Sequence, residues 1–340
     1  MTVLNKLIIF LTVAIGFFAS ASAQELNVYS SRHYQSDEAL YTGFTKLTGI
    51  KVSRIEADED ALIERLRNEG IRSPADVLIT TDAGRLWRAQ MLGLFQPVRS
   101  ALLEARIPKS FREPGNRWYG FSMRSRVIAY NKSRVRPEEI ESYEALTEPK
   151  WKGRICVRSA THIYNLSLMG ALIEHHGEAK AEAWARAVKA NLAREPKGGD
   201  TDQIKGVAAG ECDVALANHY YYARLARSKK ADDRAIAGKV GVVFPGQSGS
   251  GTHVNISGAG VTKSAPHRDA AIRFLEYLAS DEAQRYFADG NNEWPVVASV
   301  RVDNPVLAHI GEIRYDPLNV SALGSNQAAA QRIFDRVGWK

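Results

Sequence analysis

The sequence predicts an α/β protein with two doubly wound lobes, in each of which helices cover a mostly parallel sheet. Two observations lead to this expectation. Strand patterns and helix patterns alternate along the chain, and this order is typical of parallel sheets with helices packed on their faces. The length of 340 residues suits about two domains, and the content of 45% hydrophobic and 24% charged residues is that of an ordinary globular protein.

The first lobe is expected to begin with three pairs of a strand and a helix. Residues 25–30 alternate apolar and polar side chains, as a half-buried strand does. Ser36, followed by two acidic residues, is an N-cap signal for a helix that should end at Gly49. The later elements continue this alternation. They are strands at 50–55 and 75–80 and helices at 58–70 and 82–92.

A second series of elements follows a long extended run, F-S-M-R-S-R-V-I-A-Y-N, at 121–131. Apolar alternation predicts further strands, and the 3.6-residue period predicts further helices. The expected strands lie at 151–157, 213–218, 238–245 and 257–262. The expected helices lie at 164–175, 179–193, 201–209, 265–288 and 327–337.

The chain is expected to cross between the lobes near 121–130, 253–260 and 300. These crossings give two domains with discontinuous sequence. The N-terminal lobe comprises 24–126 plus 253–300, and the C-terminal lobe comprises 127–252 plus 301–340. Lobes joined by hinge strands of this kind close around a ligand at their interface.

The first 23 residues predict a signal peptide. Lys6 lies before an apolar stretch at 7–19, and A-S-A at 21–23 is a small-residue cleavage signal. The alternative is a membrane anchor, but the apolar stretch is too short to span a bilayer comfortably. No cysteine follows the cleavage signal for lipid attachment. We therefore expect an exported, soluble mature protein that begins near Gln24.

The charge of the chain argues against a nucleic-acid-binding protein. The formal net charge is +7, but arginines are scattered among acidic residues and do not form a dense basic stripe with interleaved aromatics. The two cysteines, Cys156 and Cys212, fall in expected strands of the same lobe. They either form a disulfide, as an exported protein allows, or remain buried thiols. A cysteine zinc site is excluded because no C-x-x-C is present.

Three tyrosine segments follow strands of the two expected sheets. His33 and Tyr34 follow the strand at 25–30, Tyr164 follows the strand at 151–157, and Tyr220, Tyr221 and Tyr222 follow the strand at 213–218. Ligands of open α/β sheets bind beyond the carboxyl ends of the strands. The first segment belongs to one lobe and the other two to the second lobe, so we expect them to face one cleft.

Phenol oxygens crowded at one place suit a hard, highly charged cation. A free phenol has a pKa near ~10, but a bound cation deprotonates its ligands. Ferric iron is the natural biological cation for such a cluster. Four phenolates, one neutral imidazole and Fe³⁺ leave a single negative charge, which a nearby arginine would balance. The candidate arginines are Arg32, Arg124 and Arg126.

Other interpretations of these residues remain open. A single tyrosine after a strand is more often a packing residue, and His162 and His219 are more often loop residues than ligands. The tyrosine run also suits an aromatic cage for an organic solute such as a polyamine, thiamine or a sugar. An enzyme is disfavoured, because G-x-S-x-G, H-E-x-x-H and a convincing Ser/His/Asp order are all missing from the sequence.

The sequence resembles a known family, the periplasmic iron-binding proteins of ABC transporters of Fut and Fbp type. The specific motifs are Y-S-S-R-H-Y at 29–34, I-Y-N around Tyr164 and N-H-Y-Y-Y at 218–222. General support comes from P-A-D-V-L-I-T-T-D-A-G-R-L at 74–86, P-K-W-K-G-R-I at 149–155 and V-A-A-G-E-C-D-V-A-L-A-N at 207–218. The resemblance covers nearly the whole mature chain.

The resemblance implies a bilobal type II periplasmic-binding-protein fold and a role in iron transport. It implies that Tyr220 and Tyr221 bind Fe³⁺ together with His33, Tyr34 and Tyr164, whereas Tyr222 supports them from outside the coordination sphere. An obligatory anion is not implied, because tyrosines replace the residues that accompany it in other branches. The same donors are compatible with Fe²⁺. The implied partner is an inner-membrane ABC permease, and the expected protein is a periplasmic monomer.

Overall fold

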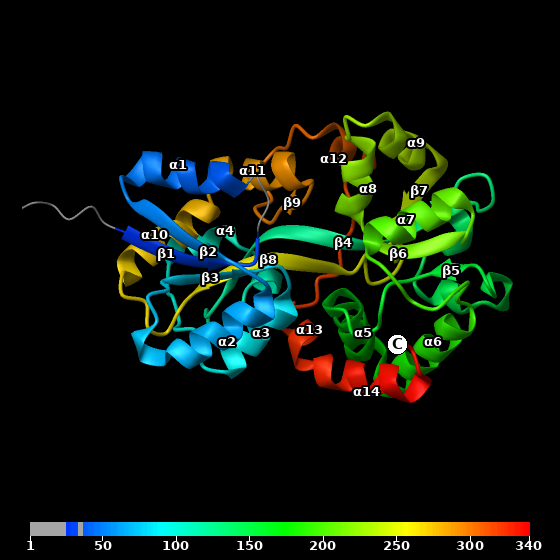
Figure 1. The fold of residues 1–340 in the computed structure, drawn as a ribbon, viewed down its shortest axis with the longest axis horizontal. Helices are drawn as coiled ribbons and strands as arrows, with labels where there is room; N and C mark the ends of the chain where they lie inside the picture. Colours follow the sequence, from blue (N-terminus) through cyan, green and yellow to red (C-terminus); the bar gives the residue numbers. More distant parts are fainter. Residues whose placement is uncertain (1–24, 33–36) are drawn as a thin grey trace, which may run out of the picture.

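The computed structural model describes residues 25–32 and 37–340, which form two lobes on one continuous sheet of nine strands (Figure 1). The strands are β1 (Glu25–Ser30), β2 (Lys51–Glu56), β3 (Val77–Thr80), β4 (Tyr119–Asn131), β5 (Ile155–Cys156), β6 (Val214–Asn218), β7 (Val240–Val243), β8 (Val254–Val261) and β9 (Trp294–Pro295). Their order is β2-β1-β3-β8-β4-β6-β5, with β7 and β9 also paired to β4.

Helices cover this sheet in both lobes (Figure 1). The helices of the first half of the chain are α1 (Glu38–Thr48), α2 (Glu59–Glu69), α3 (Ala83–Met91), α4 (Ala101–Arg106) and α5 (Ile163–His176). The later ones are α6 (Glu178–Ala190), α7 (Asp200–Ala209), α8 (His219–Ala226), α9 (Ala231–Lys239), α10 (Arg268–Leu278), α11 (Asp281–Asn291), α12 (Pro305–Ile310), α13 (Ser321–Ser325) and α14 (Gln327–Val337).

Strand β4 connects the two lobes. Its first half pairs antiparallel with β8, from Tyr119 to Ser125, and its second half pairs with β6 and β7, from Arg126 to Asn131. The parallel strands β1, β2 and β3 lie on one side of this junction, and β5 lies parallel to β6 on the other. Figure 1 shows β4 and β8 running across the middle of the molecule.

Each lobe has its own hydrophobic core. Lobe one, as we use the name, is built around β1, β2, β3 and β8 with α1 to α4, α10 and α11, and its core includes Phe44 and Phe274. Lobe two is built around β5, β6 and β7 with α5 to α9 and α14, and its core includes Trp151, Trp184 and Ile333. The residue limits predicted above for the two domains stay a prediction.

Three details differ from the sequence-based expectations. The single helix expected at 265–288 is wrong: the structure has α10 and α11, because the Ser280 side chain accepts a hydrogen bond from the backbone of Ala283 and starts a new helix. The strand expected at 151–157 is reduced to the two residues of β5 after a 3₁₀ turn, Pro149–Trp151. The tyrosine run, expected where a strand leaves the sheet, forms the first turn of α8.

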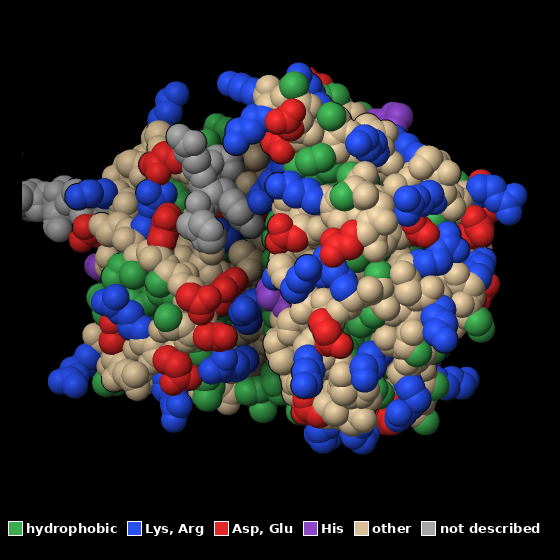
Figure 2. Space-filling view, turned by 45° about the vertical axis from the view of Figure 1, so that its right-hand side comes forward, with side chains coloured by type: hydrophobic (Ala, Val, Ile, Leu, Met, Phe, Trp, Pro, Cys, Tyr) green, Lys and Arg blue, Asp and Glu red, His purple; other side chains and the backbone are tan. Residues whose placement is uncertain are grey.

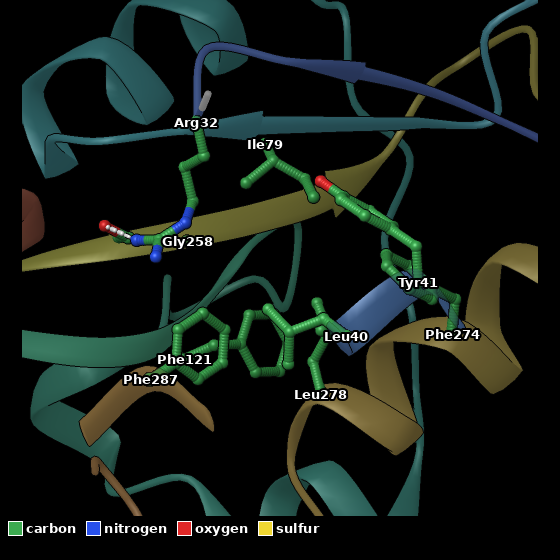
Figure 3. A pocket seen from close by; sticks show the side chains of 10 residues that line it. Arg32, Leu40, Tyr41, Ile79, Phe121, Gly258, Phe274, Leu278 and Phe287 are labelled. Atoms are coloured by element: carbon green, nitrogen blue, oxygen red, sulfur yellow. Dashed lines mark hydrogen bonds between the residues drawn. The ribbon is translucent and has the colours of Figure 1, made fainter. Parts of the chain in front are cut away.

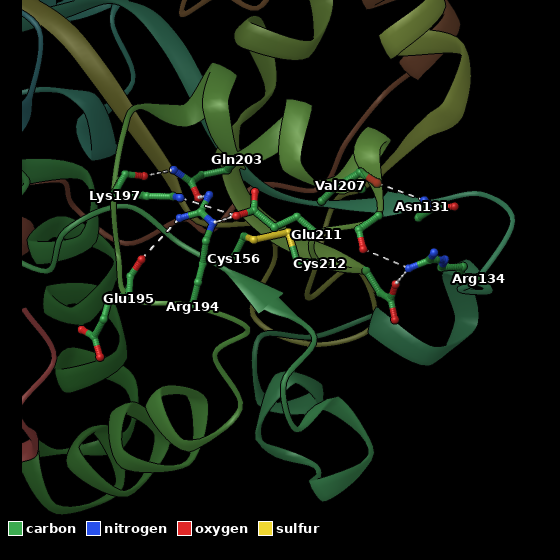
Figure 4. Close-up of a disulfide and its surroundings, with 12 residues drawn as sticks. Asn131, Arg134, Cys156, Arg194, Glu195, Lys197, Gln203, Val207, Glu211 and Cys212 are labelled. Atoms are coloured by element: carbon green, nitrogen blue, oxygen red, sulfur yellow. Dashed lines mark hydrogen bonds and ion pairs between the residues drawn. A yellow bond between two sulfur atoms is a disulfide. The ribbon is translucent and has the colours of Figure 1, made fainter.

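A disulfide joins Cys156 in β5 to Cys212, just before β6, with 5.8 Å between the Cα atoms (Figure 4). Of the two alternatives left open by the sequence, the structure therefore has the bridge. An ion pair between Arg194 and Glu211, at 2.9 Å, lies beside it. The bridge links the two strands that precede the tyrosine segments of lobe two.

The surface of the molecule carries charges of both signs. Figure 2 shows Lys and Arg side chains spread over both lobes with Asp and Glu side chains between them. Within the described part of the chain, no helix has both the length and the apolar character needed to cross a bilayer.

Candidate metal centre

Three of the five predicted ligands lie together in lobe two. The hydroxyl oxygens of Tyr164 and Tyr220 are 3.0 Å apart, and the rings of Tyr220 and Tyr221 stack with centroids 4.4 Å apart. Tyr220 is buried, whereas Tyr164 and Tyr221 are half-buried. The other two predicted ligands, His33 and Tyr34, lie outside the described residues.

The sheet explains why residues 56 positions apart meet. Strands β5 and β6 are parallel neighbours, so α5 and α8, which follow them, begin at the same edge of the sheet. Tyr164 is the second residue of α5, and its backbone N–H donates to Nδ1 of His162, the N-cap residue. At the other segment, the backbone N–H of Asn218 donates to buried Asp200 at 2.7 Å. Hydrogen bonds at the starts of α5 and α8 therefore fix the backbone of both tyrosine segments.

The spacing of the hydroxyls suits a small cation. Two phenol oxygens at 3.0 Å share a proton in a hydrogen bond. Oxygen ligands about 2 Å from a small cation, at right angles to each other, are separated by about 2.8 Å. A small cation could therefore bind both oxygens with little movement of either, once both phenol protons have been released.

Arginines surround the phenol rings. Three guanidinium carbons lie near the Tyr164 ring centroid: Arg158 at 5.2 Å, Arg124 at 5.6 Å and Arg126 at 5.9 Å. Arg224 lies 5.0 Å from the Tyr220 ring and 5.5 Å from the Tyr221 ring. Positive charge at such distances favours the ionised form of a phenol. Positive charge from β4 and α8 therefore surrounds the tyrosine rings.

Arg124 is the buried cation of this group with the fewest polar contacts. Its Nη1 donates to the Ser257 hydroxyl at 3.1 Å, while Nε and Nη2 have no hydrogen-bond partner among residues 25–32 and 37–340. The nearest carboxylates are those of Asp82, 3.8 Å from Nη2, and Glu293, 3.9 Å from Nη1. Burial opposes its charge, but Tyr164 and Asp82 outweigh this and hold the pKa of the guanidinium above its usual value.

The other two predicted arginines have closer partners. Arg126 donates to Asp200 at 2.7 Å and to the Asn165 side chain at 2.9 Å. Arg32 pairs with Asp37 at 2.9 Å and with Glu293 at 3.0 Å. Both ion pairs are buried in lobe one. Figure 3 shows the Arg32 guanidinium beside an apolar hollow in that lobe, near the ring of Phe287. Of the three, Arg124 contacts both lobes, at Ser257 of lobe one and at the Tyr164 ring of lobe two.

Sequence reasoning missed three charged residues of the site. Arg224 lies one helical turn after Tyr220, and recognising α8 from the sequence would have placed it there. Arg158 directly follows the strand that leads to Tyr164, which is a weaker signal. Glu293 comes from a distant segment. Burial would raise its pKa, but Arg32 and Arg124 lower that pKa below the usual range, so it is an anion.

The two histidines beside the tyrosines are neutral and engaged elsewhere. Burial, reinforced by Arg158, lowers the pKa of His162 to about 3, and burial lowers the pKa of His219 to about 4. Both ring nitrogens of His219 bond to the backbone, at Ser125 and Asn292. That neither histidine is a ligand stays a prediction.

Tyr222 faces away from the other two tyrosines of the run. It lines a surface groove with Tyr130, Phe244 and His309, and burial raises the pKa of its phenol. In the part of the chain that the structure describes, no group of three His, Cys, Asp or Glu side chains is arranged to hold a metal ion.

The fold and the cluster can now be compared with known proteins. The family model for bacterial extracellular solute-binding proteins matches residues 72–310. The chain belongs to this family. Membership confirms the prediction of a binding protein rather than an enzyme.

Several relatives within this family are similar over almost their whole length. Iron uptake protein A2 of Synechocystis sp. is 52% identical, over 95% of this chain and 92% of that protein. The structure of FutA (IdiA) from Trichodesmium, in complex with iron and citrate ligands, has a TM-score of 0.91 at 55% identity and covers 93% of this chain and 100% of that one. The ferric binding protein from Campylobacter jejuni has a TM-score of 0.87 at 40% identity, with 93% and 100% covered.

These likenesses confirm two predictions made from the sequence. The chain has the bilobal type II periplasmic-binding-protein fold, since it superposes on ferric-binding proteins over both lobes. The resemblance to the Fut and Fbp type is also confirmed.

Proposed function

We propose that this protein binds Fe³⁺ between its lobes through Tyr164, Tyr220 and Tyr221, together with His33 and Tyr34. The observation that carries the proposal is the pair of phenol oxygens 3.0 Å apart, surrounded by arginines. The iron named in the relatives' descriptions supports the same cation. Arg124, Arg126 and Arg32 would balance the charge of the phenolates, with Tyr222 outside the coordination sphere.

We further propose that the protein acts in the periplasm and delivers iron to an inner-membrane ABC permease. The signal peptide predicted at 1–23 and the extracellular solute-binding family support the location. The lobes would close on the metal, and opening or protonation of the phenolates would release it. Purified iron-loaded protein should stimulate ATP hydrolysis by such a permease in vesicles. It should do so as a monomer in size-exclusion chromatography.

The iron proposal is tested by colour. Titration with ferric citrate should produce a phenolate-to-Fe³⁺ charge-transfer band that tints the protein orange to red. Tyr220→Phe should weaken iron binding by more than about 100-fold, because even residues behind the ligands contribute 10- to 100-fold to metal affinity. Tyr130→Phe, at a half-buried tyrosine outside the cluster, is the matched control and should behave as the wild type.

The runner-up is an organic solute held by the aromatic rings. Four arginines near the rings disfavour a cationic solute such as a polyamine. Calorimetry with ferric citrate, spermidine, thiamine and simple sugars separates the two ideas. Heat from an organic solute together with a colourless iron mixture would replace the iron proposal. The same titration under reducing conditions tests whether Fe²⁺ binds as well.

A further inference from the structure

His219, the residue before the two adjacent tyrosines, is fully buried where lobe two meets lobe one. Its Nδ1 accepts a hydrogen bond from the backbone N–H of Ser125 in β4, at 3.1 Å. Its Nε2 donates to the backbone carbonyl of Asn292, just after α11, at 2.7 Å. A backbone N–H only donates and a carbonyl only accepts, so the ring is held as the single tautomer with its proton on Nε2.

Aromatic side chains fix the plane of the same ring. The Trp294 ring stacks on it with centroids 3.9 Å apart, and Phe244 lies 6.5 Å away. Trp294 belongs to β9, which pairs with Met123 in the lobe-one half of β4, whereas Phe244 follows β7 of lobe two. The imidazole therefore contacts the crossing strand and both lobes at once.

A second contact joins the other end of α8 to lobe one. Arg227, the C-cap residue, donates from Nη1 to the carbonyl of Asp289 at 2.9 Å and to the side-chain oxygen of Asn292 at 2.7 Å. Asn292 thus receives bonds from both ends of the helix that carries Tyr220 and Tyr221. A shift of lobe one relative to lobe two must break these bonds or move α8.

We propose that His219 is a positioning residue that holds the first turn of α8 against the crossing strand and lobe one. The proposal rests on the proposed function in one respect, that Tyr220 and Tyr221 are taken as iron ligands. His219 would link the angle between the lobes to the position of these two oxygens. Opening of the lobes would then displace the oxygens from the metal, and closure would restore them.

The first test needs no iron. His219→Asn keeps a side-chain oxygen near the position of Nδ1 for Ser125, whereas His219→Gln keeps a donor near the position of Nε2 for Asn292. Spin labels at Leu47 of lobe one and Lys189 of lobe two, both exposed, report the distance between the lobes. We expect a narrow distribution for the wild type and His219→Gln and a broad one for His219→Asn. Identical distributions in all three proteins would overturn the proposal.

The second test uses ferric citrate. His219→Asn should weaken iron binding by about tenfold, the worth of one or two buried hydrogen bonds, without moving the charge-transfer band. Tyr220→Phe should change the band itself. A shifted band in His219→Asn would make His219 a ligand and overturn the positioning role. Ile333→Val, in the core of lobe two, is the control that should leave affinity and lobe distance unchanged.

The two tests separate the two ideas. If the wild type binds no iron, the proposed function fails, while the spin-label distances still decide the role of His219. If iron binds but His219→Asn has the same lobe-distance distribution as the wild type, the positioning role fails alone.

Discussion

The two sides of the candidate site handle charge in opposite ways. In lobe one, Arg32 pairs with Asp37 and Glu293 at hydrogen-bond distance, so the buried charges neutralise one another. In lobe two, arginines surround the Tyr164 ring, and two of them, Arg126 and Arg158, pair with the buried carboxylate of Asp200. The buried arginine of lobe one therefore has two carboxylate partners, whereas two arginines of lobe two share one carboxylate. Positive charge is therefore more fully paired in lobe one than around the tyrosines of lobe two.

Arg124 connects the two regions. It shares the Ser257 hydroxyl with Arg32 and also lies near the ring of Tyr164. Desolvated charges of this kind are costly when a partner is lost, while well-solvated pairs contribute little. The following predictions test how far the contrast between the two regions holds.

The largest effect is expected from the disulfide, which ties together the strands leading to the tyrosines and has no equivalent in lobe one. It closes a loop across 56 residues. Replacing both cysteines, Cys156→Ser with Cys212→Ser, should lower the free energy of unfolding by about 4 kcal/mol on loop-closure grounds. Thermal unfolding measures the loss. Hydrogen exchange should quicken in α5 and α7 and stay unchanged in α1 and α2; equal quickening in both lobes would contradict the contrast.

Removal of Arg124 should have the next largest effect. Arg124→Met leaves the buried carboxylates of Asp82 and Glu293 without one of their cations, which should cost about 3 kcal/mol. Chemical denaturation measures this cost. Arg186→Met, which breaks an exposed pair with Glu182, should cost less than about 1 kcal/mol. Equal losses of unfolding free energy in the two variants would show that the buried pairs of Arg124 contribute no more to stability than an exposed pair.

The free energy of unfolding should depend on pH through His253, which lies at the boundary between the lobes. Burial, with Arg126, Arg124 and His175 acting in the same direction, lowers its pKa to about 3. The unfolded chain binds that proton near pH ~6.5 and the folded chain does not, so stability falls as pH falls from 6.5 toward 3. We expect a loss of about 2 kcal/mol between pH 7 and pH 5 from this group.

The control for this pH effect is His253→Asn. Its unfolding free energy should depend less on pH over the same interval. A residual slope of the same sign is expected from His219 and His162, whose pKa values are also lowered by burial. A variant with the same pH profile as the wild type would show that His253 is not buried as a neutral ring.

The tyrosine cluster could be predicted from the sequence because its members follow strands that local patterns reveal. Strand patterns place Tyr164 and Tyr220 after parallel strands, and parallel strands end at a common edge. The helix α8 was missed because three tyrosines in succession show neither the period of a strand nor that of an amphipathic helix. As a result, Arg224 was missed as well.

The ion pairs of Arg32 and the hydrogen bonds between β4 and His219 could not be predicted from local sequence patterns. The pair between Arg32 and Glu293 spans 261 positions, and the bond between Ser125 and His219 spans 94. Nothing in the local pattern around Glu293 marks it as the partner of a particular arginine. Such pairs depend on how β4, β8 and β9 meet in the folded sheet, and local periodicity carries no information about that arrangement.

The smallest predicted effect sharpens the contrast within lobe two itself. Arg224 is half-buried and lies over the rings of Tyr220 and Tyr221. Arg224→Gln should weaken iron binding by about threefold to fivefold, as expected for loss of a partly solvated cation near aromatic rings. The effect should shrink as ionic strength rises, because exposed charges are screened.

The control for Arg224 is Lys229→Gln, an exposed cation beyond the end of α8. It should leave the affinity unchanged at moderate salt. Chelator competition measures both variants, and the band position should stay constant because no ligand is altered. If Arg224→Gln lost as much iron affinity as Tyr220→Phe, Arg224 would belong among the residues that define the coordination sphere. The division between ligands and charge-balancing residues would then have to be redrawn.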